Sequence, residues 1–236
     1  MVNVKGRRRR WIWVVGLAGA FFAFCLGLGG SSLSAAQGDR GPASIVNTYY
    51  DQILEAFADT KLSKEQLRKK LQGMAREVFT FQIMAQMSLG RNWQDLDTDQ
   101  QQEFVDLFTR LLENTYFQKI ENHLSEIREY SEDDLQVTDE IVFSSRKAEV
   151  QTKISYEGKN VPVHYRFVKM ESGWKIYDVL VEEISLVQNY RSQFNDRLQK
   201  ISVSEFLLDL QKKVHKLESR QENASATNEL QEQRLG

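Results

Sequence analysis

Hydrophobic residues recur at helical spacing in the first half of the chain. Apolar side chains three or four positions apart share one face in residues 42–57, 63–81 and 98–127, and this period predicts three amphipathic helices. A short apolar segment, 81–90, joins the second helix to the third and stops at Gly90. We therefore expect the first half of the chain to be helical.

The period changes to two in the following part of the chain. Polar and apolar residues alternate over 135–143, 148–156 and 161–167, which predicts three strands. A fourth strand, 174–181, is apolar at most positions. Turns that contain Gly, Asn and Ser separate the last three strands, so we expect neighbouring strands to pair in an antiparallel meander.

Two more helical segments, 184–201 and 202–217, follow the strands. Ser202 with Glu205 has the spacing of a capping box at the start of the last helix, as Ser63 has near the start of the second. The predicted fold class is α+β: helices first, then a four-stranded antiparallel sheet, then helices that return to cover it.

The fourth strand is unusual because it carries apolar side chains on both faces. Strict alternation predicts Trp174, Ile176 and Leu180 on one face and Tyr177, Val179 and Val181 on the other. A strand of this kind must be covered on both sides.

The segment 1–36 has the parts of an export signal. Lys5 and the four arginines at 7–10 precede a long uncharged apolar run, which ends in small residues. We expect cleavage before Gln37; the alternative is an uncleaved anchor, because the apolar run is long enough to span a bilayer. Either outcome places the rest of the chain outside the cytoplasm.

Removal of the signal leaves about 200 residues, enough for one domain with a substantial core. We assign this domain to 37–217 and expect 218–236 to be a disordered polar tail, since it lacks aromatic residues. The lone Cys25 leaves with the signal, which excludes disulfides and thiol chemistry. Five basic residues leave as well, so the formal net charge falls from −2 to −7 and argues against a nucleic-acid partner.

The chain offers little evidence of catalysis. His123, His164 and His215 are not in a metal-binding spacing, and the sequence has no nucleophile motif or phosphate-binding glycine loop. Asp178 is the best candidate for a general base, because burial would raise its pKa. The competing interpretation is a structural carboxylate that anchors an arginine such as Arg191. We therefore predict no catalytic residue and no metal site.

Two separate segments resemble the toluene-tolerance family of periplasmic phospholipid-binding proteins, which includes MlaC-like shuttles of the Mla lipid-transport pathway. The first is 84–116, and the second is "GWKIYDVLVEEISLVQNYRSQF" at 173–194. The family pattern is matched in the second segment by Trp174, Lys175, Tyr177, Asp178, Ser185, Tyr190, Arg191 and Phe194. The chain departs from the pattern at Glu182 and Glu183, where glycine is common.

The resemblance implies a curved sheet related to the NTF2-like cone, wrapped by about six helices that enclose an apolar cavity for acyl chains. Tyr190 and Phe194 would close this cavity. We take candidate lipid-binding residues from the apolar faces of the surrounding elements, each of which could equally be plain core: Phe79, Met84, Met87, Phe108, Leu112, Tyr116, Val163, Tyr165, Phe167, Trp174, Ile176 and Val179.

The function implied by the resemblance is that of a periplasmic carrier with phospholipid as cargo and no cofactor. Its partners would be an inner-membrane ABC transporter complex with a lipid-binding permease partner and an outer-membrane lipoprotein–porin complex. Two alternatives stay open: a small-molecule enzyme on an NTF2-like cone that uses Asp178, and a membrane-anchored binding subunit for another lipid, such as a hopanoid.

Overall fold

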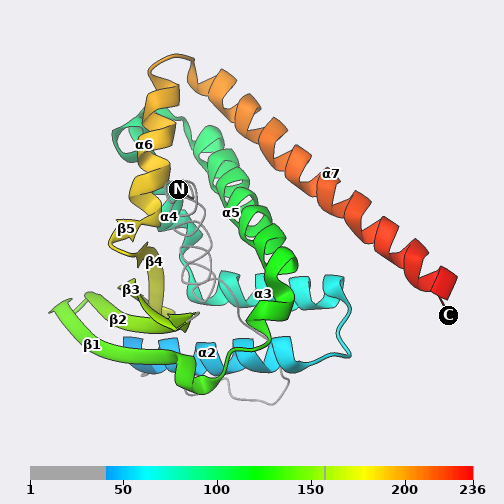
Figure 1. Ribbon diagram of the computed structural model, residues 1–236. Helices are drawn as coiled ribbons and strands as arrows, with labels where there is room; N and C mark the ends of the chain where they lie inside the picture. Colours follow the sequence, from blue (N-terminus) through cyan, green and yellow to red (C-terminus); the bar gives the residue numbers. More distant parts are fainter. Residues whose placement is uncertain (1–40, 157, 236) are drawn as a thin grey trace, which may run out of the picture.

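The computed structural model describes residues 41–156 and 158–235, which form an α+β fold (Figure 1). These residues contain six α-helices: α2 (Pro42–Ala58), α3 (Lys64–Val78), α4 (Phe81–Leu89), α5 (Thr98–Ile127), α6 (Leu186–Leu198) and α7 (Val203–Leu235). The strands are β1 (Leu135–Ser144), β2 (Lys147–Tyr156), β3 (Lys159–Met170), β4 (Gly173–Val181) and β5 (Ile184–Ser185). Two short 3₁₀ helices are η2 (Gly90–Asp95) and η3 (Glu132–Asp134). The predicted α+β class is confirmed.

The starts of two predicted helices are fixed by the expected caps. At α3 the Ser63 hydroxyl accepts a hydrogen bond from the Gln66 backbone N–H at 3.1 Å, and the Gln66 side chain accepts one from the Ser63 N–H at 2.8 Å. At α7 the Ser202 N–H donates to Glu205 at 3.0 Å. These local bonds satisfy amide groups that the helices leave without intrahelical partners.

The C-terminal helix is longer than predicted. Residues 218–235 continue α7 as helix, where we expected a disordered tail, and α7 extends away from the rest of the fold in Figure 1. Arg110 of α5 donates from Nε and Nη2 to the two carboxylate oxygens of Glu218, at 3.0 and 2.9 Å, and so links α7 to α5. The segment beyond Glu218 is rich in Ala, Glu and Gln, which favour helix even without an apolar stripe.

The predicted export segment 1–36 and its cleavage site lie outside the described residues. Within residues 41–156 and 158–235, no helix combines the length and apolar character needed to cross a membrane.

The sheet has five strands in the order β1-β2-β3-β4-β5, all antiparallel, rather than the four that we predicted. The additional strand, β5, is only two residues long and pairs with the end of β4. The turn between them consists of Glu182 and Glu183, which both have positive φ angles, 48° and 66°. A two-residue hairpin turn with two positive φ values favours Asn and Gly, but this chain has two glutamates there. The sequence therefore lacks the usual turn signal, and a strand of two residues is too short to show a hydrophobic period.

A β-bulge in β4 changes which residues share a face. Arg166 pairs with Asp178 while Phe167 pairs with Ile176, so Tyr177 is an extra residue in β4. Ile176, Val179 and Val181 consequently lie opposite Phe167, Tyr165 and Val163 on one face. The predicted separation of Ile176 from Val179 is therefore wrong, because strict alternation does not survive the bulge.

The two faces of the sheet differ, and we name them by their residues on β3. The inner face carries Val163, Tyr165 and Phe167, which are all buried, and the outer face carries His164 and Arg166, which are half-buried. Figure 1 shows α2 lying along the sheet, where it packs against β1 and β2. The helices α3, α4 and α6 pack against β4, and α5 packs against α4 and α7.

Candidate functional site

The predicted lipid-binding residues lie in one hydrophobic cluster. Ten of the twelve are buried, namely Phe79, Met84, Phe108, Leu112, Tyr116, Val163, Tyr165, Phe167, Ile176 and Val179. Met87 and Trp174 are partly buried and pack against the same cluster. Because these residues come from α4, α5, β3, β4 and the α3–α4 junction, the fold brings distant parts of the sequence into one apolar interior. Their contact with a ligand stays a prediction.

The α3–α4 junction is attached directly to the sheet. Phe79 forms an isolated parallel bridge with Ile176, and the Thr80 N–H donates to the Ile176 carbonyl oxygen at 2.9 Å. Lys175 also donates to the Glu77 carbonyl oxygen. These backbone contacts hold the start of α4, with Met84, close to the inner face at β4.

Aromatic rings fill one end of the interior. The aromatic cluster consists of Trp93, Phe104, Phe108, Tyr190, Phe194 and Phe206, with neighbouring ring centroids 5.3–6.5 Å apart. It joins η2, α5, α6 and α7, and most ring pairs are tilted or edge-to-face, which is a favourable arrangement. Tyr190 and Phe194, which we expected to close the cavity, are thus part of a packed end where α6 meets α5 and α7.

Three buried tyrosines contribute hydroxyl groups to the interior. Burial raises the pKa of Tyr190 to about 12, although a hydrogen bond with Thr115 opposes the rise. Burial likewise raises the pKa of Tyr116 and Tyr165 above the ordinary tyrosine value. These hydroxyls remain protonated at neutral pH, so they add hydrogen-bonding capacity to an otherwise apolar surface without adding charge.

Asp178 is on the outer face and is fully engaged in hydrogen bonds. Its Oδ1 accepts from the backbone N–H groups of Val179 and Val187, at 2.9 and 3.1 Å. Its Oδ2 accepts from the Ser185 hydroxyl at 2.6 Å and from Arg166 Nη1 at 3.4 Å. Burial raises the pKa of Asp178, and these hydrogen bonds only partly offset the effect.

The contacts of Asp178 join β4 to the start of α6. The Ser185 hydroxyl, which donates to Asp178, also accepts from the Gln188 N–H at 3.0 Å and so caps α6. The carboxylate therefore fixes the direction in which α6 leaves the sheet, and with it the position of Tyr190. With four donors around it, Asp178 has little capacity left for a substrate proton.

The arginine that contacts Asp178 is Arg166. The suggested partner, Arg191, does not make this contact. Arg166 also donates from Nε to Glu149 at 3.0 Å and so bridges two buried carboxylates from neighbouring strands. Burial acts to raise the pKa of Glu149, but hydrogen bonds from Gln151 and Arg166 outweigh it and lower that pKa. Sequence reasoning missed Arg166 as the partner of Asp178, because the bulge in β4 brings these two residues opposite each other. It also missed Glu149, which pairs with Arg166 in the regular register of β2 with β3.

Arg191 instead lies against Gly90, the C-terminal cap residue of α4. Gly90 has a φ of 59°, and a Cβ built at this position would lie 2.4 Å from the Arg191 Nε. Only glycine allows this approach, so Gly90 and Arg191 form a close contact between α4 and α6.

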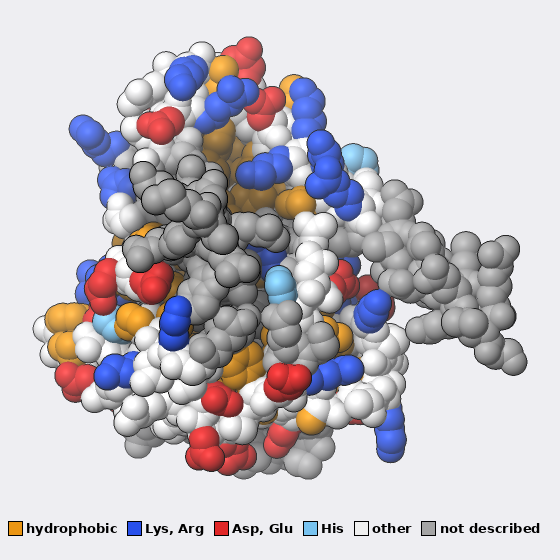
Figure 2. Space-filling model, in the orientation of Figure 1, with side chains coloured by type: hydrophobic (Ala, Val, Ile, Leu, Met, Phe, Trp, Pro, Cys, Tyr) orange, Lys and Arg blue, Asp and Glu red, His pale blue; other side chains and the backbone are white. Residues whose placement is uncertain are grey.

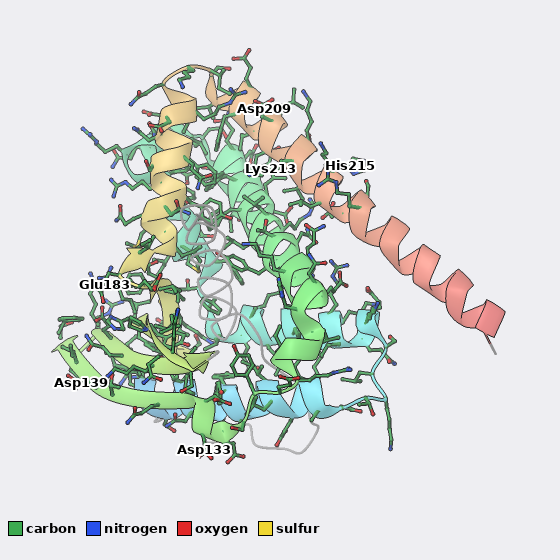
Figure 3. All side chains as sticks on the ribbon, viewed as in Figure 1. Asp133, Asp139, Glu183, Asp209, Lys213 and His215 are labelled. Atoms are coloured by element: carbon green, nitrogen blue, oxygen red, sulfur yellow. The ribbon has the colours of Figure 1, made fainter. Side chains whose placement is uncertain are left out.

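Charged side chains lie mainly outside the interior. In the upper part of Figure 2, Lys and Arg side chains gather over α6 and α7, with hydrophobic side chains visible between them. Figure 3 places Glu183 at the junction of the sheet with α6 and places Lys213 and His215 on α7. Among the residues that the structure describes, no three His, Cys, Asp or Glu side chains form a group suited to a metal ion.

Comparison with known proteins supports the resemblance. A solved structure of the phospholipid-binding protein from Ralstonia solanacearum, in complex with a phospholipid, matches with a TM-score of 0.58 and 23% sequence identity. The match covers 73% of this chain and 96% of that chain. At this identity the likeness establishes the fold. No curated protein sequence matches the chain.

The chain also matches a protein-family model over most of its length. The family model described as MlaC protein matches residues 47–212, which include the two segments that carry the resemblance and all the candidate lipid-binding residues. This range is well over half of the sequence. The chain belongs to the MlaC protein family.

Proposed function

We propose that this protein is a phospholipid carrier of the Gram-negative periplasm. It encloses acyl chains between the inner face of the sheet and helices α4 and α5 and carries lipid between the inner and outer membranes. The observation that carries the proposal is the single apolar cluster that joins these elements. Membership in the MlaC family and a fold shared with a phospholipid-bound structure support it.

The energetics of lipid transfer favour an enclosing protein over a surface patch. Exposing an acyl chain of about 16 carbons to water costs on the order of 12 kcal/mol, at about 0.8 kcal/mol per methylene. A carrier must offset this cost for each chain while it crosses an aqueous compartment. Aliphatic and aromatic walls without charges can do so, and the headgroup can remain hydrated at the opening.

The chemistry of Asp178 favours a carrier over an enzyme. An enzyme on an NTF2-like cone would need an acid or base directed into the interior. Asp178 lies on the outer face and accepts hydrogen bonds from Ser185, Arg166 and two backbone amides. Its function in this proposal is to hold α6 in place.

A periplasmic carrier requires export and two docking partners. The segment 1–36 would direct export, with cleavage before Gln37. An inner-membrane ABC transporter complex with a lipid-binding permease partner and an outer-membrane lipoprotein–porin complex would exchange lipid with the carrier. In-cell crosslinking followed by mass spectrometry would test both contacts.

The main test is the identity of the bound lipid. The protein is purified from a Gram-negative periplasm and extracted with organic solvent, and the extract is analysed by mass spectrometry. We expect phospholipid in stoichiometric amounts. Recovery of a hopanoid instead would favour the alternative lipid-binding subunit, and recovery of no lipid, together with no uptake from vesicles, would refute the carrier function.

A matched pair of variants tests where the lipid binds. Leu112→Trp adds bulk to the buried wall on α5, while Leu208→Trp adds the same bulk at an exposed position on α7. We expect the first variant to lose most of its bound lipid and the second to keep it. Thermal unfolding of both proteins shows whether loss of lipid reflects loss of fold.

A further inference from the structure

Two arginines of the protein bind carboxylates through the same edge of the guanidinium group. Arg76 donates from Nε and Nη2 to the two carboxylate oxygens of Glu113, at 2.6 and 2.8 Å. Arg110 donates from Nε and Nη2 to Glu218, at 3.0 and 2.9 Å. In both pairs, two parallel N–H donors meet two oxygens of one anion, which is the strong bidentate arrangement.

Arg68 presents the same edge without an anion. Its Nε and Nη2 atoms are buried, and neither has a hydrogen-bond partner among the described residues. The guanidinium carbon lies 4.7 Å from the centroid of the Phe117 ring, so the group packs over this ring of α5. Leaving buried donors without acceptors is unfavourable, and most buried polar groups in proteins are paired.

Arg68 has charged groups of both signs in its neighbourhood. Glu121 of α5 is an acidic group that interacts with Arg68, and Lys64 and Glu65 of α3 also act on the Glu121 carboxylate. Burial raises the pKa of Glu121, while Arg68 and Lys64 act to lower it. Glu121 nevertheless does not hydrogen-bond to Nε or Nη2 of Arg68, so both donors of this edge lack an acceptor among the described residues, and an oxyanion bound here would supply one.

We propose that the Nε and Nη2 edge of Arg68 binds a phosphate group. The two non-bridging oxygens of a phosphodiester match this edge as the carboxylates of Glu113 and Glu218 match Arg76 and Arg110. Phe117 is buried in the same hydrophobic cluster as the candidate lipid-binding residues, so a phosphate at Arg68 lies beside the proposed acyl-chain interior. Its source is a lipid headgroup, which rests on the carrier function proposed above, or a free phosphate anion.

The first experiment compares a lipid that carries a phosphoglycerol headgroup with one that lacks it. The wild-type protein and variants are incubated with mixed vesicles of phosphatidylglycerol and diacylglycerol with identical acyl chains, and bound lipid is measured by mass spectrometry. Arg68→Met removes the donors and keeps an apolar side chain on Phe117, and Arg68→Lys keeps the charge without the fork. Lys69→Met removes one charge from an adjacent, exposed position that pairs with Glu65.

We expect the wild-type protein to favour phosphatidylglycerol and Arg68→Met to lose about tenfold of this preference, with Arg68→Lys between them. Lys69→Met should match the wild type. An unchanged preference in Arg68→Met overturns the headgroup as the source. If the wild-type protein takes up neither lipid, the carrier function fails, and the next experiment still tests the site.

The second experiment uses inorganic phosphate alone with the same variants. A rise in melting temperature with added phosphate that is present in the wild type and in Lys69→Met, but absent in Arg68→Met, supports a phosphate site at Arg68. When it occurs together with an unchanged lipid preference in Arg68→Met, it identifies a free anion as the source. Equal behaviour of wild type and Arg68→Met in both experiments overturns the proposal.

Discussion

The inner and outer faces of β3 and β4 use the same two strands for different purposes. On the inner face, Val163, Phe167 and Val179 are buried and make only apolar contacts through side chains that carry no hydrogen-bonding groups. On the outer face, Arg166 and Asp178 take part in directed hydrogen bonds at 2.6–3.4 Å. Apolar contacts set no unique geometry, which suits a variable lipid chain, whereas the directed bonds fix the register of β3 with β4 and the exit of α6.

The comparison predicts that the largest loss of stability comes from the outer face. Asp178→Ala removes the acceptor of Ser185 and of two backbone amides, and it leaves Arg166 with Glu149 as its remaining carboxylate partner. Removing one partner from a buried, hydrogen-bonded charge cluster costs about 3–5 kcal/mol. We expect a decrease of this size in the free energy of unfolding, measured by denaturant titration.

Two further variants distinguish the anchoring role of Asp178 from a general effect of losing a surface charge and from a catalytic role. Asp209→Ala breaks the exposed ion pair with Arg197 and should have a much smaller effect, because exposed pairs are screened by solvent. Asp178→Asn keeps the shape of the side chain, and the folded fraction of this variant should retain lipid. A loss of stability in Asp178→Ala no larger than that in Asp209→Ala would contradict the anchoring role.

A smaller effect should distinguish the faces when both receive the same change. Val179→Thr places a hydroxyl on the buried inner face, while Val168→Thr places one on β3 at a half-buried position of the outer face. An unpaired hydroxyl in an apolar site costs about 1–3 kcal/mol, and a half-buried one can contact water. We expect Val179→Thr alone to lower the melting temperature clearly. Equal losses in the two variants would mean that the faces do not differ as described.

The sequence predicted the elements better than the contacts between them. Hydrophobic periodicity located five of the six helices and four of the five strands, because each of these buries one face and therefore repeats apolar residues at a fixed spacing. It marked 81–90, which forms α4, only as an apolar segment. The short hairpin of Met170 with Gly173 would, by simple counting, place Arg166 opposite Tyr177. The bulge shifts the register by one residue and brings Asp178 to that position instead.

The site was predicted in part for the same reason. Apolar faces identified the residues of the interior, since the side that is buried follows from the pattern alone. The partners of Asp178 and the donors of Arg68 depend on which elements meet in space, and no local pattern encodes that. The helical continuation of α7 was missed because its last part lacks an apolar stripe, although its residues favour helix.

The smallest predicted effect concerns the turn that connects β4 to β5. Glu182 and Glu183 adopt positive φ angles, which are unfavourable for residues with a side chain and favourable for Asn and Gly in this type of turn. We expect Glu182→Asn with Glu183→Gly to raise the free energy of unfolding by roughly 0.5–1 kcal/mol. The control, Glu182→Gln with Glu183→Gln, removes the same two charges but keeps the backbone strain, and should give no such gain. If both double variants are stabilised equally in denaturant titrations, repulsion between the glutamates and not the backbone would be the cause.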